Sequence, residues 1–125
     1  MSGRRALLIV DHGSRQPEAN AVVSEIARMT RRLRPELIVE YAHMEIAEPT
    51  LKQGVASCVA AGAQEIIVHP YLLADGRHSR ETIPEEVERV AASHPEIRFK
   101  ITDPLGPHEK LAELVLLRLD DLGLS

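Results

Sequence analysis

Cysteine is nearly absent from this chain. Cys58 is the single cysteine among 125 residues, so no disulfide can form within the chain, and neither a CxxC redox pair nor a zinc cage of thiolates can be built. This composition fits a reducing compartment, and we expect a cytoplasmic protein. No apolar run approaches the roughly 18 residues of a membrane span. Residues 1–5 are too short and polar for a signal peptide, so no membrane association is expected.

Aromatic residues and excess positive charge are also scarce. The chain has two tyrosines, one phenylalanine and no tryptophan, so a platform on which nucleic-acid bases stack is not expected. Fifteen basic residues against nineteen acidic ones give a formal net charge of −4, which disfavours nucleic acid as a partner. Any anion site must therefore be a local cluster of basic side chains.

What the sequence does contain is a regular alternation of apolar segments with strand and helix periodicity. Its length matches one domain, residues 1–125, that buries roughly two-thirds of its unfolded surface. Short connections between the segments predict an α/β fold with a parallel sheet. We expect strands at 6–11, 37–43, 65–70 and 97–102, and helices at 17–34, 49–62, 81–93 and 107–122. Right-handed crossovers then predict a single-domain, doubly wound sheet of about four strands in the order 2-1-3-4, flanked by helices.

The residue types within these segments refine the prediction. The uninterrupted apolar runs at 6–10 and 65–68 are typical of central strands that are covered on both faces. The segment 97–102 alternates apolar and polar residues, which indicates an edge strand. Pro17, Pro49 and Pro84 lie near the expected helix starts, where a missing N–H costs nothing.

The last expected helix, 107–122, carries leucines and a valine most of the way round. One reading is a well-buried terminal helix. The other is that part of this apolar surface meets a partner subunit. The sequence favours neither.

Three side chains suited to metal binding follow three successive strands: His12, Glu45 and His78. The carboxyl ends of parallel strands meet at one edge of a sheet, and the second and third strands would flank the first about 10 Å apart. Side chains can close such a gap over one ion. Two imidazoles and a carboxylate suit Fe²⁺, Co²⁺, Ni²⁺ or Zn²⁺ and leave coordination positions open. Any regular repeat of strand and helix gives this even spacing, so spacing alone does not establish a site.

Longer motifs carry a resemblance to a known family. The segments "VDHGSR" (10–15), "VEYAHMEIAEPT" (39–50), "GAQEIIVHPYLLADGRHSRETIP" (62–84) and "DPLGPH" (103–108) resemble class II chelatases that act on sirohydrochlorin, the short sirohydrochlorin ferrochelatase and cobaltochelatase family. The resemblance runs from about residue 6 to about residue 118. It implies a chelatase-like fold and insertion of a divalent metal into a tetrapyrrole without ATP. The ferrochelatases of siroheme synthesis are matched better than the cobalt enzymes of cobalamin synthesis.

The resemblance also implies roles for individual residues. The family's catalytic histidines fall on His12 and His78, and its acidic metal-site residue falls on Glu45. Short members of the family act as homodimers. No cofactor beyond the substrate metal, Fe²⁺ or Co²⁺, is implied, and no iron–sulfur cluster is expected because the Cys-rich tail of some relatives is missing.

Histidine is a natural helper in this reaction, because two pyrrole N–H protons leave as the metal enters and imidazole accepts protons near neutral pH. Sirohydrochlorin carries multiple carboxylates. Basic side chains beside the two histidines suit these groups, and Ser14 and Tyr71 complete the expected substrate-binding set of Arg15, Arg77 and Arg80. Ser14 is expected to bond the loop backbone and not to act as a nucleophile.

Other interpretations stay open. His43 and His69 read as hydrogen-bonded core histidines that could also reach the site, and His108 as a surface residue. A phosphatase with His12 as nucleophile would have Arg before the histidine, where this chain has Asp11. A non-catalytic carrier of metal or tetrapyrrole would bind the same ligands, and a regulatory flavodoxin-like domain would bind no metal at these histidines.

Overall fold

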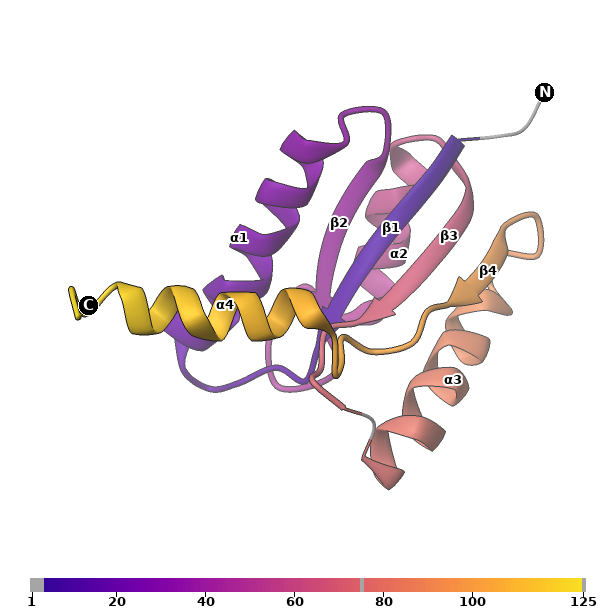
Figure 1. The fold of residues 1–125 in the computed structure, drawn as a ribbon. Helices are drawn as coiled ribbons and strands as arrows, with labels where there is room; N and C mark the ends of the chain where they lie inside the picture. Colours follow the sequence, from indigo (N-terminus) through magenta and orange to yellow (C-terminus); the bar gives the residue numbers. More distant parts are fainter. Residues whose placement is uncertain (1–3, 75, 125) are drawn as a thin grey trace.

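In a computed structural model, the chain forms a four-stranded parallel sheet with helices on both faces (Figure 1). The structure describes residues 4–74 and 76–124, without the side chains of residues 77–80. The strands are β1 (Arg4–Asp11), β2 (Ile38–His43), β3 (Ala63–Pro70) and β4 (Arg98–Ile101). The helices are α1 (Pro17–Leu33), α2 (Leu51–Ala60), α3 (Arg77–Ala91) and α4 (Glu109–Asp120). The strand order β2-β1-β3-β4, with parallel pairing throughout, confirms the predicted fold class and topology.

The central strands are β1 and β3, as their apolar runs predict. Leu8 and Val10 of β1 and Ile66 and Val68 of β3 are completely buried. At the edge, β4 keeps Phe99 half-buried and its charged residues exposed, so the predicted edge strand is also confirmed.

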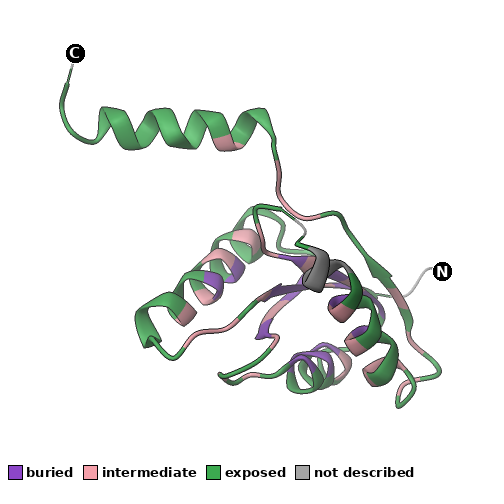
Figure 2. Cartoon of the chain, turned by 90° about the horizontal axis from the view of Figure 1, so that it is seen from below, coloured by how far each residue is buried: buried purple, intermediate pink, exposed green. Residues whose placement is uncertain are grey.

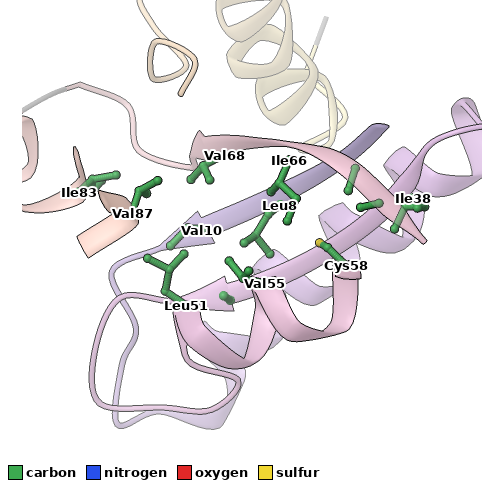
Figure 3. Packing of buried hydrophobic residues seen from close by; sticks show 13 residues of the cluster. Leu8, Val10, Ile38, Leu51, Val55, Cys58, Ile66, Val68, Ile83 and Val87 are labelled. Carbon is green, nitrogen blue, oxygen red and sulfur yellow. The ribbon is translucent and has the colours of Figure 1, made fainter. Parts of the chain in front are cut away.

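The core has two parts, one on each face of the sheet. On one face, α2 and α3 pack against the strands, and Figure 3 shows side chains of α2, α3 and the three longer strands meeting there. On the other face, α1 lies over β1 and β2 and buries Val23 and Ala27. Each fully buried large aliphatic side chain contributes roughly 1.5–3 kcal/mol to stability.

Helix α3 begins four residues before the predicted start. Its N-cap is Gly76, and Pro84 lies inside the helix and not near its start. The prediction was wrong because proline is favoured in a first turn, yet a helix can also hold it in its interior at the cost of one hydrogen bond and a steric conflict with the preceding turn. As a result, the segment from Arg77 to Arg80 forms the first turn of a helix and not the loop before it.

Helix α4 projects from the body and packs none of its residues in a core (Figure 2). The reading of a well-buried terminal helix is therefore wrong. Large apolar side chains are exposed on it and just after it, namely Leu114, Val115, Leu116, Leu117 and Leu119 on the helix and Leu122 beyond its end. Among the described residues, no helix is long and apolar enough to cross a membrane.

Candidate functional site

The segments that follow β1 and β2 run side by side beyond the carboxyl ends of these strands. The backbone N–H of Met44 donates to the carbonyl of Asp11 at 2.9 Å, and that of Glu45 donates to the carbonyl of His12 at 3.1 Å. These bonds continue the parallel pairing of β1 and β2. His12 and Glu45 are both exposed at the edge where open α/β sheets bind ligands. Two of the three predicted metal ligands are thus brought together.

Gly13 makes this close approach possible. Its φ is +91°, a conformation that residues with a side chain rarely adopt. A Cβ on Gly13 would lie 1.9 Å from the carbonyl oxygen of Glu45 and 3.2 Å from the Cβ of His43. The glycine in "DHGSR" is therefore required for the contact between the two segments.

Ile46, directly after Glu45, adopts a strained conformation. Its φ is +75°, and the N–H of Ala47 donates to the carbonyl of Glu45 at 2.8 Å, which closes a γ-turn. A β-branched residue in this region is a conformational outlier, and such strain gathers at functional sites. The turn fixes the backbone of Glu45 immediately beside His12.

The loop from Ser14 to Gln16 is tied to the first turns of α1. Ser14 donates its backbone N–H to Oδ1 of Asn20 at 2.9 Å, and Nδ2 of Asn20 donates to the carbonyl of Ser14 at 2.7 Å. The hydroxyl of Ser14 accepts the N–H of Gln16 at 3.0 Å, which confirms the expected bond to the loop backbone. Arg15 is exposed between these residues. Substrate binding by Ser14 and Arg15 stays a prediction.

The third predicted ligand, His78, lies in the first turn of α3 together with Arg77 and Arg80. The side chains of these three residues are outside the described part of the structure. Among the side chains that are described, no group of three or more His, Cys, Asp or Glu residues could hold a metal ion. The complete triad of His12, Glu45 and His78 therefore stays a prediction.

A polar pair, the buried His43 and the partly buried Asp11, lies next to these exposed groups. Nδ1 of His43 is 2.5 Å from Oδ1 of Asp11, and the His43 ring packs edge-on against Tyr41 with centroids 5.9 Å apart. His43 is 1 % exposed, which confirms a hydrogen-bonded core histidine. The sequence did not indicate the role of Asp11. A signal was present nonetheless, since each residue ends one of two strands expected to be neighbours.

His69 and Tyr71 lie at the carboxyl end of β3. Nδ1 of His69 is 2.7 Å from Oγ1 of Thr102, and burial lowers the pKa of His69, although a backbone hydrogen bond to Asp103 acts in the opposite direction. Tyr71 is half-buried against the α1-side core, 6.4 Å from the His69 ring between centroids. His69 is hydrogen-bonded as expected, but it is only half-buried. Contact between Tyr71 and a substrate stays a prediction.

His108 has a structural role at the start of α4. It is exposed, as expected, and its Nδ1 accepts the backbone N–H of Lys110 at 3.0 Å. It thereby caps one of the free N–H groups of the helix.

An open parallel sheet in this strand order, with helices on both faces, defines an α/β protein of the doubly wound class, and exposed His12 and Glu45 lie at its carboxyl edge. The chain belongs to the CbiX family, whose model matches residues 6–122. This match confirms the family resemblance that the motifs carry.

Curated relatives are named for metal insertion into sirohydrochlorin. The chain is 41 % identical to "Sirohydrochlorin ferrochelatase, chloroplastic" of Arabidopsis thaliana, over 87 % of this chain and 48 % of the relative. It is 33 % identical to the sirohydrochlorin ferrochelatase of Bacillus subtilis, over 96 % of this chain and 46 % of the relative. It is 35 % identical to the sirohydrochlorin cobaltochelatase of Methanococcoides burtonii, over 94 % of this chain and 96 % of the relative.

Solved structures give the same picture. The sirohydrochlorin chelatase SirB from Bacillus subtilis subspecies spizizenii, in complex with cobalt, matches with a TM-score of 0.85 and 33 % identity, over 94 % of this chain and 50 % of that chain. A CbiX protein from Marinobacter aquaeolei matches with a TM-score of 0.80 and 26 % identity, over 94 % and 95 %. The chain therefore spans about half the length of several relatives and nearly the whole length of others.

Proposed function

We propose that the chain is a sirohydrochlorin chelatase, which inserts a divalent metal into sirohydrochlorin without ATP. The observation that carries the proposal is the pairing of two exposed groups, His12 and Glu45, in a member of the CbiX family. The names of the curated relatives support the same substrate. In the reaction, one divalent ion enters the ring and two pyrrole N–H protons leave it.

The proposed roles follow from the chemistry of the side chains. His12 and His78 hold the incoming metal and accept the displaced protons, and the carboxylate of Glu45 offsets positive charge and orients the ion. Only neutral imidazole binds a metal, so activity falls as the pH drops and the histidines become protonated. Three protein ligands leave coordination positions for the nitrogen atoms of the ring.

The carboxylates of the tetrapyrrole require cations and hydrogen-bond donors. Arg15, Arg77 and Arg80 supply fixed positive charge that pairs with carboxylates. The hydroxyl of Ser14 accepts the Gln16 N–H, so its own proton stays available to a substrate oxygen. Tyr71 offers a phenol at the same end of the sheet.

Fe²⁺ is the favoured metal, because the motifs around His12, Glu45 and His78 resemble the ferrochelatases of siroheme synthesis more than the cobalt enzymes. The alternative is a cobaltochelatase, the name carried by the archaeal relative of matching length. Imidazole and carboxylate bind Fe²⁺, Co²⁺ and Ni²⁺, so supply in the cell can select the metal. No cofactor beyond this substrate metal, and no iron–sulfur cluster, is part of the proposal.

The test is anaerobic mixing of the protein with sirohydrochlorin and, separately, Fe²⁺, Co²⁺ or Ni²⁺, with the tetrapyrrole absorbance followed against a control without protein. We expect acceleration that falls by about 10²-fold or more in His12→Ala and His78→Ala. His94→Ala, just beyond the C-terminal end of α3, is the histidine control and should keep the wild-type rate.

Each outcome has a definite meaning. Folded His12→Ala and His78→Ala variants with wild-type rates would overturn the assigned roles. Tetrapyrrole and metal binding without acceleration would favour the carrier interpretation. The metal that is inserted fastest would decide between a ferrochelatase and a cobaltochelatase.

We also propose that the working form is a homodimer in which α4 of each copy packs against the other copy. A helix of 12 residues is marginal in water without tertiary packing, and α4 buries none of its residues within its own chain. It is apolar nearly all round, which is typical of a helix that is enclosed by protein. The α1-side face of the sheet is also incomplete, because α1 lies over β1 and β2 but not over β4.

Sedimentation of wild type and of a Leu116→Glu/Leu119→Glu variant tests the dimer. Wild type should sediment as a dimer and the variant as a folded monomer, because the two substitutions introduce charge only on exposed positions of α4. Wild type that stays monomeric at all concentrations would contradict the proposal. Arg118→Glu, on the same helix, is the control for added negative charge and should disturb the dimer less.

Location and other partners stay predictions. The single cysteine still favours a cytoplasmic location, and the net charge of −4 still disfavours nucleic acid. Fractionation of the native organism's cells would test the location directly.

A further inference from the structure

The Asp11–His43 pair is an unusual feature of this core. Among the described residues, the buried polar or charged side chains are His43 and Glu65, and Glu65 lies far away with Arg5 near the amino ends of the strands. A carboxylate can only accept hydrogen bonds, so Nδ1 of His43 carries the proton and donates to Asp11. The pair therefore has a defined orientation across the β1–β2 junction.

Packing alone does not require these two residue types. The His43 ring lies edge-on to Tyr41, as other aromatic rings can, and Ile9, Val23 and Val39 form an apolar cluster on the same side of the sheet. A phenylalanine ring has a similar flat shape, although it is somewhat larger, and has no polar atom to satisfy. The hydrogen bond between the imidazole and the carboxylate therefore accounts for these two residue types, and its role depends on which segments it joins.

The bond joins the two segments that carry the exposed groups. Asp11 directly precedes His12, and His43 stands two residues before Glu45. His43 also donates its backbone N–H to the carbonyl of Pro49 at 2.8 Å, so the return of the chain from the Glu45 turn is fixed to the same residue. The Gly13 backbone lies directly against the Cβ of His43.

We propose that Asp11 and His43 are positioning residues, whose buried hydrogen bond fixes the separation and orientation of His12 and Glu45 for metal capture. This inference rests on the proposed function, since it assigns His12 and Glu45 to the metal. Groups that orient metal ligands from behind typically change metal affinity or activity by about 10–100-fold when they are removed. Neither residue touches the metal in this proposal.

The experiment compares Asp11→Leu, His43→Phe and the conservative Asp11→Asn with wild type, in steady-state insertion with Co²⁺ and sirohydrochlorin. Asp11→Leu and His43→Phe should raise KM for Co²⁺ by about 10-fold or more, with KM for sirohydrochlorin within about twofold of wild type. Asp11→Asn keeps an acceptor oxygen for the Nδ1–H of His43, so its KM for Co²⁺ should stay within about threefold of wild type. When Co²⁺ is added to the protein without tetrapyrrole, the visible absorbance of the bound ion should be weaker in Asp11→Leu and His43→Phe than in wild type.

Val55→Ala is the matched control for a loss of stability. Val55 is buried in α2 against the opposite face of the sheet, so its truncation should lower the melting temperature without changing KM for Co²⁺. Unchanged KM for Co²⁺ in Asp11→Leu and His43→Phe, or an equal rise in Val55→Ala, would overturn the positioning role. Wild type that neither binds Co²⁺ nor accelerates insertion would instead overturn the proposed function itself, and the inference with it.

Discussion

The loops after β1 and β2 and the helix α4 lie at the same end of the sheet. They differ in how many contacts fix them to the rest of the chain. The loops are polar and short, yet backbone hydrogen bonds, the close approach of Gly13 and the buried Asp11–His43 bond fix them in place. Helix α4 is strongly apolar, yet none of its residues is buried.

This contrast indicates two kinds of site. Where small polar groups are held firmly but left exposed, the chain has prepared its side chains for a ligand, because ordering them in advance lowers the cost of binding. Where large apolar groups are exposed together, the contact that would stabilise them is missing within the chain, and the proposed dimer would supply it. The first region is assigned here to chemistry and the second to a partner copy.

Truncating one leucine in the body of the protein and one in α4 should give the largest difference in the free energy of unfolding. Leu8→Ala removes a completely buried side chain and should lower the free energy of unfolding by about 2–5 kcal/mol. Leu116→Ala removes one that is 58 % exposed and should cost less than about 0.5 kcal/mol at protein concentrations too low for association. Urea unfolding at low and high protein concentration measures both.

The concentration dependence is the discriminating part of this experiment. The cost of Leu116→Ala should grow where copies associate, whereas the cost of the Leu8 substitution should stay large throughout. Equal costs at low concentration would mean that α4 packs on its own body, contrary to the comparison.

Much of the fold could be predicted from the sequence because its hydrophobic patterns are strong. The apolar runs of β1 and β3 and the alternation in β4 determined which strands are central and which is an edge. The start of α3 was missed because Pro84 is compatible with both a helix start and a helix interior. The isolation of α4 was left open, because the sequence shows that a surface is apolar but not what covers it.

Gly13→Ala should have the next largest effect, and it acts on the loops. The new Cβ clashes with the Glu45 carbonyl and the backbone loses its favoured left-handed conformation, which should lower the free energy of unfolding by about 2–3 kcal/mol and separate the two loops. Metal insertion should be lost at temperatures where the variant is folded. Denaturant unfolding and the insertion assay measure the two consequences.

Gly62→Ala is the control that separates backbone strain at a positive φ from the steric clash of a new Cβ. Gly62 has a φ of +100°, but its Cβ would meet nothing closer than Cδ of Arg4 at 3.9 Å. We expect a cost of about 1 kcal/mol and unchanged insertion. If Gly13→Ala behaved like Gly62→Ala in both assays, the close approach of the loops would not matter for activity.

The sequence predicted that His12 and Glu45 lie close together, but it did not predict the contacts that hold their segments in place. His12 and Glu45 follow strands whose carboxyl ends had to meet, so topology alone brought them together. The bond between Asp11 and His43 depends on the register of β1 and β2, which places these two residues opposite each other. A shift of one residue would separate them, and the sequence does not mark the register, because strands that are covered on both faces lack a clear apolar and polar alternation.

The smallest effect concerns His69, which links the end of β3 to the segment that leads into α4. Burial lowers the pKa of His69 in the folded state, so near that pKa the folded chain binds fewer protons than the unfolded chain. The contribution of this residue to stability is therefore fully present above the unfolded pKa of about 6.5 and is lost as the pH falls from there toward the folded pKa. His69→Gln should flatten this part of the dependence of melting temperature on pH, while His94→Gln, which removes a histidine outside the β3–Thr102 contact, is the control and should leave it in place. An unchanged pH dependence in His69→Gln would show that the burial of His69 does not contribute to the pH dependence of stability.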